Sequence, residues 1–229
     1  LSKHTPDELI SIGEDPTEVG GYFIINGSER VIVSLEDLAP NRILIESDNR
    51  GSKPVYRGKV FSTTVGFRAR IEMALKAKGE IVISIPGVPV PVPFVVLMRA
   101  LGVETDRNIA EMVDLDPEIL NELEKSFVDA TDVQTIEDAI LFIGNRVAFG
   151  QVREFRLKRA ETIVDRNLLP HIGRDPTDRL DKAIFLGEMA SRIIELKFGR
   201  RVEDDKDHLK NKRTKLAGPL LAELFRSAF

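Results

Sequence analysis

The stretch Arg68–Ile85, RARIEMALKAKGEIVISI, decides the fold class of this chain. Its first half has the composition of a helix, but its apolar residues recur at every second position, which is the period of a β-strand. These residues are Ala69, Ile71, Met73 and Leu75. Residues 77–79 (AKG) then turn the chain into Ile81–Ile85, a run rich in β-branched side chains. We therefore predict an antiparallel hairpin here instead of a helix.

On the N-terminal side of this hairpin, the sequence is typical of a β-meander. Tyr22–Ile25 and Glu29–Ser34 flank Asn26-Gly27, two residues that tolerate positive φ and favour a tight hairpin turn. Arg42–Glu46 is predicted as a third strand. Residues 48–54 (DNRGSKP) combine Gly, Ser, Asn and Pro between two apolar regions, which indicates a linker.

On the C-terminal side, the pattern is helical to the end of the chain. Alternating prolines in residues 86–93 exclude a helix and a central strand, so this segment is predicted to be extended. Helices are then predicted at residues 94–101, 107–115, 117–129, 139–146, 152–169, 179–198 and 216–229. Asp116, Thr135 (with Asp138) and Asp178 are the predicted N-caps. The predicted fold class is α+β, mainly helical with small antiparallel β-sheet elements.

Composition excludes several kinds of site. The 229 residues contain no cysteine, which excludes a disulfide framework, a thiolate zinc site and a cysteine nucleophile. The three histidines (His4, His171 and His208) are too scattered for an all-histidine metal centre. No apolar run approaches the roughly 18 residues of a membrane span. Because the chain starts at Leu1 without a signal-peptide pattern, we expect a piece of a longer intracellular protein.

The formal net charge of −4 hides two opposite blocks. Residues 104–138 hold twelve acids against two bases, and residues 197–215 hold eight bases against four acids. A basic block can bind phosphate and an acidic one can bind a basic partner, although such runs are often only solvated helix faces.

No motif carries clear catalytic chemistry. The glycines of residues 20–28 fit hairpin turns better than a phosphate loop, because neither GxxxxGK[ST] nor GxGxxG is present. Residues 171–175 (HIGRD) fit a capping or surface loop better than a metal or acid–base pair. The densest group of metal-ligand types is Asp204, Asp205, Asp207 and His208. Interleaved and following lysines favour an internally paired loop there over a Mg²⁺ site. The residues alone indicate an interaction module, not an enzyme.

Several longer motifs resemble one protein family. Residues 20–31 (GGYFIINGSERV) resemble the second-largest subunit of cellular DNA-directed RNA polymerases, and residues 36–41 (EDLAPN) resemble its archaeal version. Residues 204–213 (DDKDHLKNKR), followed by 216–221 (LAGPLL), are similar to a second stretch of that subunit. Between them, residues 168–172 and 182–187 fit the archaeal and eukaryotic subtype. The resemblance spans nearly the whole chain.

The resemblance implies a domain division and a role. Residues 1–47 would be a fragment of the protrusion, 48–203 the lobe, and 204–229 a return segment to the protrusion. In the family, lobe and protrusion form one jaw of the DNA cleft and offer docking surface to other subunits and transcription factors. The parent enzyme would be a cytoplasmic nucleotidyltransferase. Its catalytic Mg²⁺ and its zinc site would lie outside this chain, so no catalytic residue or cofactor is expected here.

The candidate nucleic-acid contacts are Lys210, Lys212 and Arg213. They follow an Asp-rich turn and precede an apolar helix, so Asp205 and Asp207 can orient them. Partly paired bases of this kind contact phosphate without reading sequence. The alternative is a free-standing protein-interaction module that uses the acidic helices of residues 104–138. A metal-dependent hydrolase built on Asp204 and its neighbours is a third, weaker reading.

Overall fold

The computed structural model describes residues 3–49, 54–128 and 130–229. The chain divides into two compact units, one formed by residues 38–212 and the other by residues 1–37 together with 213–229. Both helices and antiparallel sheets are present, so the predicted α+β class is confirmed. No helix among the described residues is both long and apolar enough to cross a lipid bilayer.

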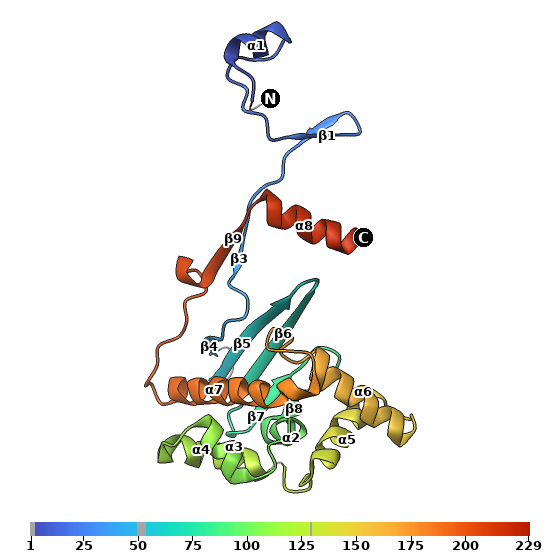
Figure 1. Cartoon of the computed structure of the whole chain (residues 1–229). Helices are drawn as coiled ribbons and strands as arrows, with labels where there is room; N and C mark the ends of the chain where they lie inside the picture. The colour runs from blue at the N-terminus through green and yellow to red at the C-terminus, as the bar shows by residue number, and fades with distance from the viewer. Residues whose placement is uncertain (1–2, 50–53, 129) are drawn as a thin grey trace. The chain divides into compact units, whose positions relative to one another are not determined.

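The larger unit is built on a five-stranded antiparallel sheet of order β4-β5-β6-β7-β8 (Figure 1). Its strands are β4 (Leu44–Asp48), β5 (Val55–Thr64), β6 (Phe67–Leu75), β7 (Ile81–Ser84) and β8 (Val92–Pro93). The predicted hairpin of Arg68–Ile85 is confirmed as β6 and β7, paired from Leu75↔Ile81 to Glu72↔Ser84. The alternating apolar residues of β6 are all buried. Because proline cannot donate to a ladder, β8 takes the edge of the sheet.

Helices follow the sheet in the order that the sequence predicts. They are α2 (Phe94–Ala100), α3 (Asp106–Val113), α4 (Pro117–Val128), α5 (Ile136–Val147), α6 (Arg153–Arg166) and α7 (Arg179–Lys197). Two short 3₁₀ helices, η1 (Pro176–Asp178) and η2 (Leu209–Asn211), flank α7 in the chain. All seven residues of α2 are buried, so this helix lies at the centre of the helical layer.

Helix α7 crosses the sheet at β5, where a glycine makes room for it (Figure 1). A Cβ at Gly58 would lie 2.8 Å from Met189 Cε and 3.0 Å from Ile193 Cδ1, both on α7. The same face of β5 carries buried Val60 and Ser62. The sheet therefore packs one face against helices, as antiparallel sheets with one solvated face do.

One predicted side-chain cap and one predicted helix end are wrong. Asp178 does precede α7, but its carboxylate Oδ2 accepts from the backbone N–H of Asp175 at 3.1 Å and does not cap α7. The helix predicted over residues 152–169 ends at Arg166, and Leu169 has φ 46°. Thr135 caps α5 as predicted, since its hydroxyl accepts from Asp138 N–H at 3.1 Å.

The remaining elements are short and lie wholly or mostly in the smaller unit. They are α1 (Pro6–Ser11), β1 (Phe23–Ile25), β2 (Ser28–Arg30), β3 (Leu35–Leu38), β9 (Lys212–Lys215) and α8 (Ala217–Ala228). The hairpin predicted at Asn26-Gly27 is confirmed, with φ of 51° and 77° at its two turn residues. Its second strand is shorter than predicted. Strand β3 was not predicted and pairs with β9. Helix α8 has no buried residue.

The predicted linker and domain boundaries are described only at their flanks. Residues 50–53, the middle of the linker at 48–54, lie outside the described residues. On either side, β4 and β5 pair with Asp48 opposite Val55. The compact unit runs from Leu38 to Lys212, while the division at 47/48 and 203/204 stays a prediction.

We expect Gly187→Ala to lower the free energy of unfolding by about 1–3 kcal/mol, because the added Cβ overpacks a helix crossing. At Gly187 on α7 that Cβ would lie 2.4 Å from the backbone carbonyl oxygen of Met112 on α3. The gain in helix propensity, about 1 kcal/mol, is smaller. Urea unfolding measures the difference. Gly218→Ala, where a Cβ meets nothing within 4 Å, is the matched control. A Gly187→Ala variant as stable as the wild type would contradict the overpacking.

Candidate nucleic-acid interface

The Asp-rich segment, which we predicted as an internally paired loop and not as a metal site, lies along the edge strand β4. The backbone N–H of Asp204 donates to Ile45 O at 2.9 Å, and its carboxylate Oδ2 accepts from Ile45 N–H at 3.0 Å. Glu203 bonds Ser47 on the same strand. Asp204 therefore satisfies the exposed backbone groups of an edge strand, which would otherwise be open to pairing.

The next carboxylate and the histidine of this segment hold local turns. Asp205 Oδ1 accepts from Asp207 N–H at 2.8 Å, and His208 Nδ1 accepts from Lys210 N–H at 3.1 Å. Asp207 is 97% exposed. Within residues 3–49, 54–128 and 130–229, no three His, Asp or Glu side chains gather as a metal site would need. The four predicted ligand types thus serve separate local bonds.

Asn211 anchors this segment, and sequence reasoning missed it. Its side chain is fully buried and donates from Nδ2 to Asp205 O at 2.6 Å. The backbone carbonyl oxygen of Asn211 accepts from Ala39 N–H at 2.8 Å, and Lys210 O accepts from Arg42 Nη1 at 3.2 Å. An asparagine inside a basic run gives no sequence signal of burial. The anchor fixes the backbone on which the candidate basic residues stand.

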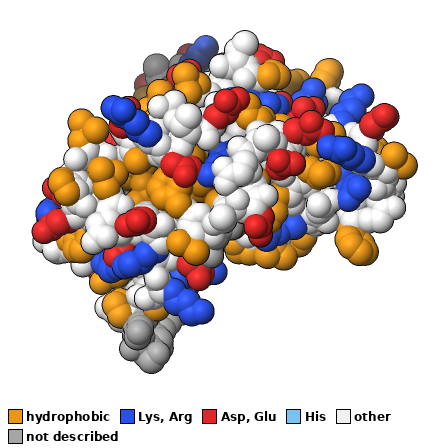
Figure 2. Space-filling model, turned by 90° about the horizontal axis from the view of Figure 1, so that it is seen from below, with side chains coloured by type: hydrophobic (Ala, Val, Ile, Leu, Met, Phe, Trp, Pro, Cys, Tyr) orange, Lys and Arg blue, Asp and Glu red, His pale blue; other side chains and the backbone are white. Residues whose placement is uncertain are grey.

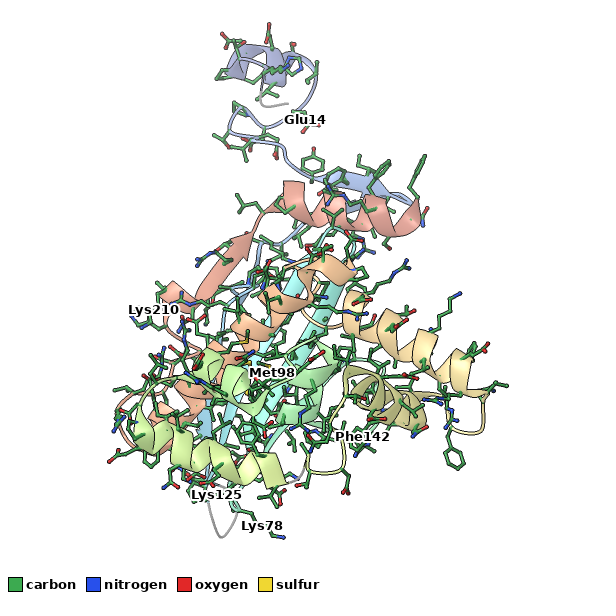
Figure 3. The ribbon with its side chains drawn as sticks, turned by 60° about the horizontal axis from the view of Figure 1, so that its bottom comes forward. Glu14, Lys78, Met98, Lys125, Phe142 and Lys210 are labelled. Carbon is green, nitrogen blue, oxygen red and sulfur yellow. The ribbon has the colours of Figure 1, made fainter. Side chains whose placement is uncertain are left out.

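Two of the candidate contacts, Lys210 and Lys212, lie in the larger unit on either side of this anchor. Lys210 is exposed at the outer side of the segment (Figure 3). Lys212 is half-buried, and its Nζ lies 3.8 Å from Asp207 Oδ1, as the predicted pairing with the Asp-rich turn requires. Arg213 is exposed and belongs to the smaller unit. Their role at DNA stays a prediction.

Glu46 on β4 forms ion pairs with two lysines, Lys59 and Lys206. Lys206 Nζ lies 2.7 Å from Glu46 Oε2, and Lys59 bonds the other carboxylate oxygen. Burial of Glu46 raises its pKa, but the hydrogen bonds and charges of Lys206 and Lys59 outweigh burial and leave the pKa below its usual range. Glu46 therefore stays ionised and neutralises part of the basic block.

Lys197 and Arg200, at the start of the basic block, pair with acids of α4 and of the residue before it. Lys197 Nζ lies 2.7 Å from Glu122 Oε1. Arg200 Nη1 lies 2.8 Å from Asp116 Oδ2, and Arg200 also bonds Glu118. The blocks of opposite sign that the sequence separates by about 80 residues thus meet in the fold. Figure 2 likewise shows charges of both signs interspersed over one face.

The loop of residues 171–175 carries a structural histidine. His171 Nδ1 lies 2.7 Å from Ser62 Oγ, which also accepts from the His171 backbone N–H at 3.1 Å. Its ring packs edge-on against Phe185, with centroids 5.3 Å apart. Burial, and then the charge of Lys182, lower the pKa of His171. A neutral ring that accepts from Ser62 is the consistent state.

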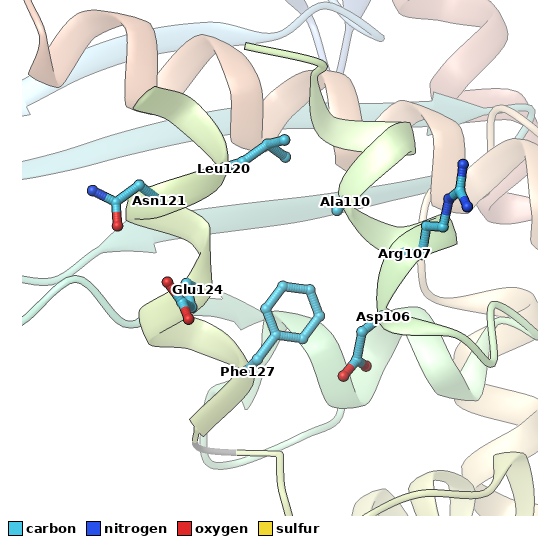
Figure 4. Close-up of a pocket in the computed structure, with 7 residues that line it drawn as sticks. All are labelled: Asp106, Arg107, Ala110, Leu120, Asn121, Glu124 and Phe127. Atoms are coloured by element: carbon cyan, nitrogen blue, oxygen red, sulfur yellow. The ribbon is translucent and has the colours of Figure 1, made fainter. Parts of the chain in front are cut away.

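A groove between α3 and α4 is a further feature that the sequence did not predict (Figure 4). It has a volume of about 390 Å³. Its lining residues are Asp106, Arg107, Ala110, Leu120, Asn121, Glu124 and Phe127. We call it the α3–α4 groove. Leu120 and Phe127 were expected on a helix, but nothing in their spacing distinguishes them from the core-facing Ile119 and Leu123 of the same helix.

The chain belongs to the family described as RNA polymerase Rpb2, domain 2, whose model matches residues 36–215. It is similar to DNA-directed RNA polymerase subunit Rpo2 of Saccharolobus shibatae, at 51% identity over 229 residues, covering 100% of this chain and 20% of that relative. It is also similar to subunit Rpo2N of Methanococcus vannielii (47% over 232 residues, 100% and 46%). Subunit Rpo2N of Methanocaldococcus jannaschii is 49% identical over 226 residues (97% and 45%).

These relatives confirm the resemblance to the archaeal second-largest subunit that residues 20–31 and 204–213 indicated. The chain spans about a fifth of the length of the Rpo2 relative and just under half of the Rpo2N relatives. The family match, residues 36–215, nearly coincides with the compact unit of residues 38–212.

Proposed function

We propose that this chain forms the lobe and adjoining protrusion surface of the second-largest subunit of a cytoplasmic, archaeal DNA-directed RNA polymerase. Residues 48–203 would be the lobe, and residues 1–47 and 204–229 parts of the protrusion. The observation that carries the proposal is the family match over residues 36–215, which covers one compact unit almost end to end. The unit would act as a wall of the DNA cleft and as docking surface for other subunits and transcription factors.

In this role the chain would hold DNA by electrostatic attraction and would supply no catalytic group. We assign no catalytic residue and no metal or cofactor site to it. Lys210, Lys212 and Arg213 would contact phosphate oxygens, which positions a duplex without reading its bases. The anchors at Asp204 and Asn211 support this assignment, because they fix the backbone that carries Lys210 and Lys212. Pre-placed bases lose less conformational freedom when they bind.

Charge reversal tests the cleft role. In the assembled polymerase, we expect Lys210→Glu, Lys212→Glu and Arg213→Glu together to weaken DNA retention. Each lost phosphate contact should reduce the slope of log affinity against log salt by about 1. Retention on a DNA template at increasing salt measures both effects. Each of the three reversals is also tested alone, with Lys78→Glu, at an exposed lysine in the turn after β6, as the control that makes the same change of charge (Figure 3). An unchanged salt slope in the triple variant would reject these contacts.

A further inference from the structure

The α3–α4 groove has an apolar floor open to solvent. Leu120 and Phe127 stand seven residues apart on one face of α4, and the Phe127 ring points across toward α3 (Figure 4). On α3, the small side chain of Ala110 leaves the space between the helices unfilled. All three side chains are only partly buried. The floor thus offers apolar contact area that the described residues of the larger unit leave partly uncovered.

The rim of the groove is negative. Glu124 is exposed, and among the described residues it has no ion-pair partner. Asp106 is 59% exposed and shares its carboxylate with Arg99 at 2.6 Å. Arg107 is paired with Glu111 at 2.7 Å, so it adds little net positive charge. An acidic rim repels phosphate and attracts a basic ligand.

The surroundings of the groove stay negative after the ion pairs of the described residues are taken into account. The segment of residues 104–138 holds twelve acids and two bases in the sequence. Among the described residues, four bases from outside the segment pair with its acids, which leaves an excess of acids. The four bases are Arg99, Arg153, Lys197 and Arg200. The field around the groove is therefore suited to a partner that brings several positive charges.

We propose that the α3–α4 groove binds a basic amphipathic helix of a partner protein. One large apolar side chain would lie on Leu120 and Phe127, and lysines or arginines would face Glu124 and Asp106. Helix-in-groove recognition uses such anchors at helical spacing. A groove of about 390 Å³ that is open at its rim fits one such anchor better than an enclosed small molecule. The inference rests on the proposed docking role and names the chemistry of one partner.

A labelled model peptide tests the proposal on the full 229-residue chain. The probe is a helical peptide of Leu and Lys at i, i+3, i+4 and i+7 spacing, followed by fluorescence anisotropy. We expect Glu124→Lys and Ala110→Leu each to weaken its binding about tenfold, the first through charge and the second by filling the floor. Glu154→Lys, the same charge change on the exposed face of α6, should alter the affinity by less than about twofold. Thermal unfolding of each variant verifies its fold.

Two peptide controls complete the test. A Glu-for-Lys peptide should not bind, and an Ala-for-Leu peptide should bind about tenfold more weakly, because it lacks the apolar anchor. Equal weakening by Glu124→Lys and Glu154→Lys, or full binding by Ala110→Leu, would overturn the groove in favour of diffuse attraction. The result is independent of DNA retention by the Lys210 variants. If the peptide binds as expected but the Lys210 variants retain DNA normally, only the cleft contacts are rejected. If the variants lose DNA but the peptide does not bind in the groove, only the groove is rejected.

Discussion

Arg99→Met is expected to lower the free energy of unfolding by about 3 kcal/mol, since it removes a charged donor from two carbonyl groups in the interior of the larger unit. Arg99 lies on the central helix α2 and is 2% exposed. Its Nη1 donates to Ala130 O at 2.7 Å and also to Val133 O, and its Nη2 bonds Asp106. The guanidinium thus ties the connection between α4 and α5 to the core.

The reason for the large effect is the burial of the acceptors. Ala130 O keeps one donor, the backbone N–H of Val133 at 3.1 Å, so the larger loss falls on Val133 O. Val133 is only 8% exposed, so water replaces the lost donor there poorly. A buried acceptor left unsatisfied costs about 1–3 kcal/mol. Methionine has a similar apolar length to the arginine stem, so the loss reflects hydrogen bonds more than volume.

Asp106→Ala is the matched control for Arg99→Met. It removes the exposed end of the same network and should cost less than about 1 kcal/mol, as surface ion pairs do. Urea unfolding at neutral pH gives both values. If the two variants lose equal stability, the ion pair and not the buried carbonyls would be the important part. Hydrogen exchange should also show faster exchange of the amides after residue 129 in Arg99→Met alone.

Local rules predicted most of the fold. The Asn26-Gly27 hairpin, the edge position of β8 and the Thr135 cap each follow from what one or two residues allow their own backbone to do. The two-residue period of β6 outweighed its helical composition for the same reason, because a sheet with one buried face sets the period. By contrast, β3 forms only by pairing with β9, more than 170 residues away, and a four-residue run carries no signal of that.

The site features that could not be predicted from the sequence depend on which side of a helix or strand the rest of the fold covers. Leu120 and Leu123 are both apolar residues of α4, yet only Leu123 is fully buried, and this difference creates the α3–α4 groove. Asn211 and Lys182 are fully buried although their residue types are usually exposed. The pairing of Lys197 with Glu122 likewise joins two segments that the sequence analysis treated as independent charge blocks.

Lys182 leads to the second large effect, a pH-dependent contribution to stability. The side chain lies in α7 with no exposed surface, and its Nζ donates to Val164 O at 3.2 Å and Asp165 O at 2.5 Å. Burial lowers the pKa of Lys182 to about 8, although the nearby carboxylates of Asp165 and Asp178 act in the opposite direction. The charged Lys182 ammonium therefore destabilises the folded chain.

The sign of the pH effect follows from the two states of the chain. The pKa of Lys182 is about 8 in the folded chain, and a lysine in the unfolded chain has a pKa of about 10.4. Between these values the unfolded chain binds more protons, so the free energy of unfolding rises with pH. Below about pH 8 both states are protonated and the burial cost is fully present. The difference between the two pKa values corresponds to about 3 kcal/mol in the free energy of unfolding.

Lys182→Met removes the titrating group while keeping an unbranched side chain in the same space. We expect the stability of the wild type relative to Lys182→Met to increase by about 3 kcal/mol from pH 7 to pH 10.5, because only the wild type loses the cost of a buried charge. Urea unfolding across this range measures the difference, in which other titrating groups cancel. Lys158→Met, an exposed lysine on α6, controls for the loss of a lysine as such. If the stability difference between wild type and Lys182→Met changes by less than about 1 kcal/mol from pH 7 to pH 10.5, the buried ammonium does not destabilise the folded chain.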